Sequence, residues 1–211
     1  MACLFLMRDS LDFAIYVDTG YAYPETLEMV NIARAMLPVH VVRTDRKGQN
    51  EREGIPADVV PIDWTSFGQS ISSVKPVKVQ GYLGCCSVNL SAPLLRAAID
   101  AGVTELVYGE RFAESHKSTA KDGDIVCGIK RLHPIESWTD DEVMAYLATK
   151  MDIPAHFSIK HSSLDCYDCT AFRKDSADRV EWMREKYPEF YSAYKARATL
   201  LDGALKQAME A

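Results

Sequence analysis

Four cysteines are the residues of this chain whose type and spacing point most directly to chemistry. Cys85 and Cys86 are adjacent, and much later Cys166 and Cys169 form a Cys-x-x-Cys pair. Four thiolates brought together from two distant segments make a closed sulfur site that suits zinc or an iron–sulfur cluster. A Cys-x-x-Cys alone also occurs in redox dithiols, so the combination with an adjacent pair is the more specific observation. The alternative is buried and inert cysteine, because free cysteine is among the most buried residue types.

Composition places the chain among ordinary soluble proteins. Its 211 residues are 47% hydrophobic and 26% charged, and its net charge of −6 gives no general polyanion-binding surface. No stretch is long and apolar enough to span a membrane, and the start does not resemble a signal peptide. We expect a cytoplasmic protein whose thiols are reduced or metal-bound. The two remaining cysteines, Cys3 and Cys127, lie in apolar surroundings, and we expect them in the core.

Strand and helix patterns alternate along the chain. We expect strands at 13–17, 39–43, 106–108 and 124–132, and helices at 2–9, 24–37, 93–101, 139–151 and, with a break near Pro188, 172–209. Residues 44–80 are polar with scattered glycine and proline, and we expect an irregular excursion there. Strands that alternate with helices predict a parallel sheet covered on both faces.

Ligands of such sheets bind at the carboxyl ends of the strands. Asp18-Thr19-Gly20 and Gly109–Ser115 are both strand-end loops of this kind. The second loop offers a compact set of donors for a phosphate or sulfate oxyanion, namely Arg111, Ser115, His116 and Lys117. The alternatives are a solvated loop for these charges, and for Asp18 a plain strand end or turn cap.

Several segments, in order, resemble one enzyme family. They are Val17-Asp-Thr-Gly20 with Pro24-Glu-Thr-Leu27, Gly109-x-Arg111-x-x-Glu114-Ser115, Pro134-Ile135 with Trp138-Thr139, Ile153-Pro154 and Cys166-x-x-Cys169-Thr170. Together they resemble the phosphoadenylyl-sulfate reductase family, within the PP-loop ATP-pyrophosphatase fold, over about residues 1–170. The adjacent cysteine pair plus the distant Cys-x-x-Cys is the pattern of that family's iron–sulfur branch.

The resemblance implies a fold, a substrate and a cofactor. The fold class is α/β, a parallel sheet flanked by helices, as domain 1–170 followed by a helical C-terminal segment, 171–211. The substrate is an adenine nucleotide carrying a sulfate, whose pocket is shaped by Asp18, Thr19 and Gly20, with Arg111, Ser115, His116 and Lys117 facing the anion. Cys85, Cys86, Cys166 and Cys169 hold a [4Fe–4S] cluster, with a structural zinc as the alternative. A thioredoxin-like protein is the expected electron donor, and a homo-oligomer is one option for the assembly.

The chain departs from the family pattern at three places. The family's Ser-x-Gly-Lys-Asp-Ser phosphate loop is absent, and residues 2–9 correspond to the helix that follows it, so we expect the first strand and the loop to be missing. Asn89 and Leu90 stand where the cluster branch has Arg-Lys, so the cation that would tune the cluster is missing from that place. No cysteine follows Cys169, which leaves the family's nucleophile without a counterpart.

Two other functions stay open. One is a PP-loop sulfur-transfer enzyme of the nucleic-acid thiolation or phosphorothioation type. Only under this alternative do we expect a nucleic-acid partner. The other is a non-catalytic remnant that binds a nucleotide or a cluster within a larger complex. The missing C-terminal cysteine favours the first, and the missing phosphate loop favours the second.

Overall fold

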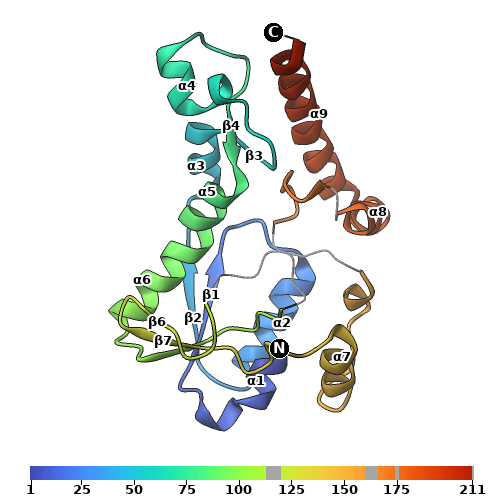
Figure 1. Cartoon of the computed structure of the whole chain (residues 1–211). Helices are drawn as coiled ribbons and strands as arrows, with labels where there is room; N and C mark the ends of the chain where they lie inside the picture. Colours follow the sequence, from blue (N-terminus) through green and yellow to red (C-terminus); the bar gives the residue numbers. More distant parts are fainter. Residues whose placement is uncertain (113–119, 160–165, 174–175, 211) are drawn as a thin grey trace. The chain divides into compact units, whose positions relative to one another are not determined.

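The computed structural model describes residues 1–112, 120–159, 166–173 and 176–210 (Figure 1). The chain forms two compact units, each assembled from three separate stretches of sequence. The first contains Met1–Tyr16, Leu27–Val42 and Leu94–Phe157, and the second contains Val17–Thr26, Arg43–Pro93 and Ser158–Ala211. No helix among the described residues is long and apolar enough to cross a membrane.

The first unit combines short strands with helices. Its elements, wholly or in large part, are α1 (Ala2–Leu6), the 3₁₀ turn η1 (Arg8–Ser10), β1 (Ala14–Asp18), α2 (Pro24–Arg34), β2 (Val39–Arg43), α6 (Ala92–Asp100), β5 (Glu105–Val107), β6 (Ile125–Val126), β7 (Ile129–Leu132), α7 (Asp140–Ala148) and η4 (Ala155–Ser158). β1 pairs with β2, and β5 pairs in parallel with β7. Ala2, Ile135 and Leu147 form a buried cluster of this unit, so α1 and α7 share one core.

One predicted strand is in fact a hairpin. The segment 124–132 divides into β6 and β7, which pair antiparallel. The turn between them is Cys127-Gly128, and both residues have positive φ, 52° and 79°. Two consecutive positive φ values are typical of a tight hairpin turn. Cys127 is therefore exposed in a turn. The prediction from its apolar surroundings, that it lies in the core, is wrong.

The second unit carries most of the remaining helices. It contains α3 (Arg46–Glu53), β3 (Ile55–Ala57), η2 (Ile62–Trp64), α4 (Ser66–Ile71), β4 (Val79–Gly81), α5 (Tyr82–Cys86), the π-helical turn η3 (Ser87–Ser91), α8 (Ala177–Lys186) and α9 (Pro188–Glu210). β3 and β4 pair in parallel, with Ile55 opposite Val79. Leu201 and Ala204 of α9 bury their side chains with Ala57, Trp64 and Val79. The C-terminal helix thus completes the core over this strand pair.

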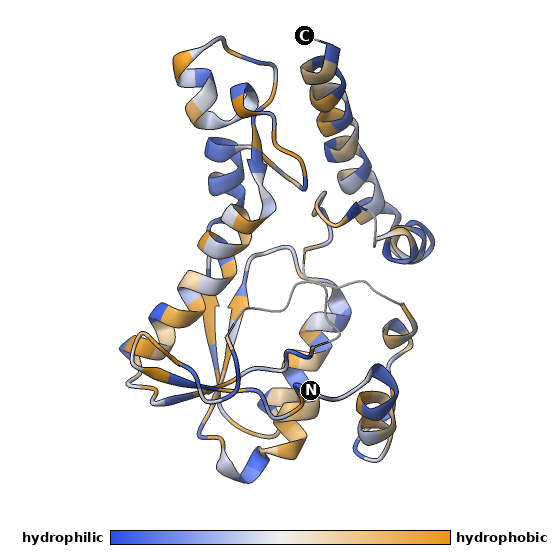
Figure 2. Ribbon diagram, viewed as in Figure 1, coloured by the Kyte–Doolittle hydropathy of each residue, from blue (hydrophilic) through white to orange (hydrophobic). Residues whose placement is uncertain are grey.

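The prediction of an irregular segment at 44–80 is wrong. α3 occupies part of it, and its residues have no apolar periodicity because its buried side chains are Arg46 and Gln49. Figure 2 shows α3 as hydrophilic. Gly54 ends the helix with φ 108°, and a Cβ there would lie 2.2 Å from the carbonyl carbon of Lys78. A glycine is required where the chain passes so close to its neighbour.

The helix expected at 93–101 begins earlier. It is continuous through α5, η3 and α6, so that Cys85 and Cys86 lie on a helix. The π-helical turn directly after the two cysteines is of a kind often found at functional sites. The break expected near Pro188 is confirmed, because Pro188 is the first residue of α9.

The α/β fold class is confirmed by parallel strand pairs, flanking helices and a helical C-terminal region. The boundary expected at residue 170 stays a prediction. Packing groups residues 158–211 with the second unit.

The core of the second unit gives a direct stability test. Leu201 is 1% exposed, whereas the adjacent Leu200 is 53% exposed. Leu201→Ala should lower the free energy of unfolding by about 2–5 kcal/mol, because it removes buried methyl groups and leaves a cavity. Leu200→Ala should change it by less than about 0.5 kcal/mol, as surface substitutions do. Urea unfolding of the two variants measures the difference, and equal effects would contradict the placement of α9.

Candidate functional site

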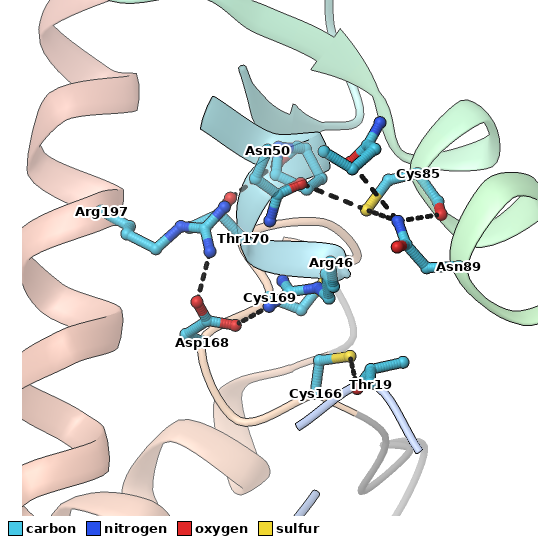
Figure 3. Close-up of polar contacts among 12 residues, drawn as sticks. Thr19, Arg46, Asn50, Cys85, Asn89, Cys166, Asp168, Cys169, Thr170 and Arg197 are labelled. Atoms are coloured by element: carbon cyan, nitrogen blue, oxygen red, sulfur yellow. Dashed lines mark hydrogen bonds and ion pairs between the residues drawn. The ribbon is translucent and has the colours of Figure 1, made fainter. Parts of the chain in front are cut away.

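The four cysteines identified from the sequence meet at one cavity of the second unit. Cys85 and Cys86 come from α5, and Cys166 and Cys169 come from the turn that precedes α8. All four line the same space of about 290 Å³, together with Thr19, Pro56, Tyr82, Asn89, Leu90 and Arg46. Figure 3 shows three of the cysteines with their polar neighbours. The two distant segments are therefore brought together, while the role of the cysteines as metal ligands stays a prediction.

A network of side-chain amides fixes the helix that carries Cys85. Gln49 of α3 donates to Gln80 of β4 over 2.7 Å, and Gln80 donates to Asn50 over 2.9 Å. The amide of Asn89 donates to Gln49 over 3.3 Å and to the carbonyl oxygen of Cys85 over 2.9 Å. Gln49, Gln80 and Asn89 are each less than a tenth exposed. Buried amides that satisfy one another hold neighbouring elements in a single register.

The same amides reach the sulfur of Cys85. Asn89 Nδ2 lies 3.7 Å from Cys85 Sγ, and Cys85 Sγ lies 3.5 Å from Asn50 Oδ1 (Figure 3). Asn89 can keep donating if Cys85 loses its proton, whereas the bond to Asn50 depends on the thiol hydrogen. Asn89 therefore suits a thiolate at this position.

The Cys-x-x-Cys turn is held from behind by Arg179. Its guanidinium donates to the carbonyl oxygen of Cys166 over 3.3 Å and to that of Cys169 over 3.1 Å. The amide N–H of Cys169 donates to the carbonyl of Cys166 over 3.1 Å, which closes the turn. The hydroxyl of Thr170 donates to the carbonyl of Pro56 over 2.6 Å and ties the turn to β3. Both sulfurs are thus attached to a fixed backbone.

Asp168 lies between these two cysteines and joins two arginines. Arg46 Nη1 donates to its Oδ1 over 2.6 Å, and Arg197 of α9 donates to its Oδ2 (Figure 3). Asp168 is 4% exposed and Arg46 is 2% exposed. One buried carboxylate therefore binds the first residue of α3, the cysteine turn and the C-terminal helix.

Burial and charge act in opposite directions on the titrating groups of the cavity. Burial raises the pKa of the Cys169 thiol, which the positive charges of Arg179 and Arg46 partly offset. Burial acts to lower the pKa of Arg46, but the negative charges of Cys166, Asp168 and Cys85 outweigh it and raise that pKa. Metal binding at this cavity would have to displace thiol protons, so its affinity would increase with pH.

The strand-end residues expected at a nucleotide pocket have separate surroundings. Thr19 is 6% exposed, and its hydroxyl lies 3.4 Å from Cys166 Sγ. Asp18 ends β1, accepts a 2.9 Å bond from the N–H of Gly20, and has Arg43 at 3.8 Å. Gly20 has φ 76°, which its turn requires. Thr19 thus belongs to the cysteine cavity, whereas Asp18 and Gly20 shape the turn.

Arg111 belongs to the first unit. Its Nη1 lies 2.5 Å from Asp140 Oδ1 at the start of α7, and its side chain is 15% exposed. The other three residues expected in the anion-binding loop, Ser115, His116 and Lys117, lie outside the described residues. A nucleotide-binding role for these residues stays a prediction.

Sequence reasoning missed Arg46, which lines the cavity, and Gln49, which holds Asn89 of its lining by a hydrogen bond. A weak pattern was present, since Arg46 and Gln49 are spaced three apart and follow Asp45, which caps α3 by accepting from the N–H of Gly48 over 2.9 Å. Charged and amide residues on a short polar segment are more often solvated, so the spacing alone did not predict burial.

Comparison with known proteins decides the family. A sequence profile of the phosphoadenosine phosphosulfate reductase domain matches residues 2–172. The chain belongs to this family. The identification that the motifs suggested is therefore confirmed, and the named relatives are reductases.

Among curated proteins, the phosphoadenosine 5'-phosphosulfate reductase of Alkalilimnicola ehrlichii is 28% identical over 143 residues, which are 67% of this chain and 52% of the relative. The adenosine 5'-phosphosulfate reductase of Mycolicibacterium smegmatis is 24% identical over 176 residues, 82% of this chain and 66% of the relative. The chain thus spans about half to two thirds of the length of these reductases.

A solved structure supports the fold. The phosphoadenylyl-sulfate reductase of Candida auris, determined as a phosphate complex, aligns with a TM-score of 0.51 and 17% identity. The alignment covers 78% of this chain and 74% of that structure. At this identity the likeness establishes the α/β fold of the family and nothing about ligands.

The buried carboxylate of Asp168 gives a test of the site. Asp168→Asn should lower the free energy of unfolding by about 3–5 kcal/mol, because it leaves the guanidinium of Arg46 buried without its counter-charge. Asp202→Asn is the matched control, since Asp202 pairs with Arg173 on the surface with 54% of its side chain exposed. That change should lower the free energy by about 1 kcal/mol or less. Urea unfolding at neutral pH compares them, and a small effect of Asp168→Asn would argue against the buried ion pair.

Proposed function

We propose that this protein acts on an adenine nucleotide that carries a sulfate, either adenylyl sulfate or its 3'-phosphorylated form, in the reductive chemistry of sulfate assimilation. Membership of the reductase family supports the substrate class. We further propose that Cys85, Cys86, Cys166 and Cys169 hold a [4Fe–4S] cluster. The observation that carries this second part is that all four line one small cavity.

The donor set and its surroundings fit such a group. Four cysteines are the usual ligands of a [4Fe–4S] cluster. The four sulfurs line this cavity together with one charged side chain, that of Arg46. The buried Nη2 of Arg46, which lacks a hydrogen-bond partner among the described residues, is available to an anionic occupant.

The sequence pattern favours a cluster over zinc. The adjacent pair Cys85-Cys86 with the distant Cys166-x-x-Cys169 resembles the iron–sulfur branch of the family. A structural zinc held by the same four thiolates is the alternative. When bound, the cluster would join the two cysteine segments and polarise a neighbouring sulfonyl group.

The chain's own residues have defined tasks in this proposal. Arg179 and Thr170 hold the Cys-x-x-Cys turn, and Asn89 orients Cys85. Reducing a nucleotide sulfate to sulfite consumes two electrons, and we propose that the dithiol of a thioredoxin-like protein supplies them. One thiolate would take the sulfonyl group and release the nucleotide monophosphate, and the second would then release sulfite and form the disulfide. The arginine of the first unit, Arg111, would bind the anionic part of the nucleotide, because a guanidinium fork matches an oxyanion.

The metal content tests the cluster. Protein purified without oxygen should be brown, with about four irons and four sulfides per chain. Cys85→Ser, Cys86→Ser, Cys166→Ser and Cys169→Ser should each lose most of the iron. The control substitutions Cys3→Ser and Cys127→Ser should retain it, since neither residue lines the cavity. A colourless protein with one zinc, or full iron in Cys166→Ser, would contradict the proposal.

Nucleotide affinity tests the role of Arg111. Arg111→Ala should weaken binding of adenylyl sulfate or its 3'-phosphorylated form by about 1.5–3 kcal/mol, the range for hydrogen bonds to charged groups. Arg111→Lys should recover part of that loss, because a point charge cannot make paired bonds. Isothermal titration calorimetry measures both, with Arg96→Ala, an exposed arginine of α6, as the control.

Three outcomes would point elsewhere. If Arg111→Ala binds nucleotide sulfate as tightly as the unmodified protein does, Arg111 serves the pair with Asp140 and not the substrate. If the protein consumes ATP and releases no sulfite, it belongs with the sulfur-transfer enzymes that share this fold. If the protein turns over no nucleotide sulfate even when an electron donor is supplied, it is a binding protein and not an enzyme.

A further inference from the structure

Arg46 is an unusual residue to find at the start of a helix. Its side chain is 2% exposed, and it is among the largest side chains of the described chain that are fully buried. Burying a cation costs several kcal/mol unless its charge and its donors are matched. Its neighbours should therefore account for every one of its polar atoms.

Two sides of the guanidinium are accounted for. Nη1 donates to Asp168 over 2.6 Å, and the plane of the group lies 4.5 Å from the ring centre of Tyr21. The third side is different, because Nη2 is buried and has no hydrogen-bond partner among the described residues. Arg46 is also one of the residues that line the cavity with the four cysteines. Figure 3 shows it among Cys85, Cys166 and Cys169.

Charge in this region does not balance through side-chain pairs alone. Asp168 is shared by Arg46 and Arg197, so one carboxylate faces two guanidinium groups. Arg179 adds a third positive charge, and its guanidinium donates to the neutral carbonyls of Cys166 and Cys169. Four thiols line the cavity beside Arg46, and they carry negative charge only once they lose their protons. An anionic occupant of the cavity would balance the positive charge that Arg46 brings to it.

We infer that Arg46 Nη2 donates a hydrogen bond to a sulfur of the cluster held by the four cysteines, and that this charge-assisted bond stabilises the cluster in the cavity. The inference rests on the proposed cluster and adds a residue from outside the cysteine segments. Hydrogen bonds to the sulfurs and nearby charge are two of the factors by which a protein tunes an iron–sulfur cluster. Asp168 acts through Arg46 by holding its orientation.

The experiment compares Arg46→Gln with Arg46→Lys and the unmodified protein, each purified without oxygen. Glutamine is neutral but can still donate to Asp168, and lysine keeps the charge without the planar fork. Iron release to a chelator should be on the order of tenfold faster in Arg46→Gln, the ratio expected for losing one hydrogen bond to a charged group. Arg46→Lys should lie between the two.

The matched control is Arg197→Gln. It removes the same charge from the same carboxylate, but Arg197 does not line the cavity. Iron release from this variant should stay within twofold of the unmodified protein. Equal rates in Arg46→Gln and Arg197→Gln would overturn the inference, because they would assign the effect to Asp168 or to the fold.

A spectroscopic readout tests the hydrogen bond directly. The Fe–S stretching bands of the unmodified protein in resonance Raman spectra should shift on exchange into D₂O, and Arg46→Gln should lose part of that shift. Bands without any solvent-isotope shift would overturn the role of Arg46 while leaving the cluster in place. Failure of the unmodified protein to assemble iron and sulfide would instead remove the cluster, and with it this inference.

Discussion

The buried ion group of Arg46, Asp168 and Arg197 is the interaction on which the second unit depends. It joins three segments that are far apart in sequence, namely α3, the Cys-x-x-Cys turn and α9. A buried ion pair adds little net stability over apolar packing, but the loss of one partner strongly lowers the free energy of unfolding. The ion group therefore determines which segments pack together, and it contributes less to the net stability of that packing. The amides of Gln49, Gln80 and Asn89 do the same for the helix that carries Cys85.

This arrangement links the fold to the chemistry of the sulfurs. Burial keeps the thiol of Cys169 protonated, whereas Arg46 and Arg179 favour its thiolate. Arg46 Nη2 has no hydrogen-bond partner among the described residues. Without an anionic occupant, neither the thiolate of Cys169 nor this guanidinium is therefore fully stabilised. Binding of a cluster would release the thiol protons and supply the missing acceptor together. Metal binding and folding of this unit should consequently be coupled.

Sequence reasoning reached what rests on local rules. The capping box of Thr139 and Glu142 begins α7 as expected, the proline at 188 begins α9, and the strand at 39–43 has those bounds in the structure. These features depend on residues within a few positions of one another. The family, and with it the convergence of the cysteines, followed from motifs in order and not from any local rule.

What the sequence did not reveal depends on contacts over long separations. α3 has no apolar face, because Arg46 and Gln49 point to partners more than thirty residues away, at Asp168 and Gln80. One local feature was also missed, because the apolar residues on both sides of Cys127-Gly128 hid the hairpin turn.

The position of the cation at the cavity is a second such case. The family's cluster branch has Arg-Lys shortly after its cysteine pair, and this chain has Asn89 and Leu90 there. The structure buries Asn89 at 3% exposure, with its amide on Gln49 and on the backbone of Cys85, where a charged side chain would break the amide network. Arg46 brings a guanidinium to the same cavity from α3. On the proposed function, the charge at the cavity thus comes from a different element, and the buried carboxylate of Asp168 holds it in place.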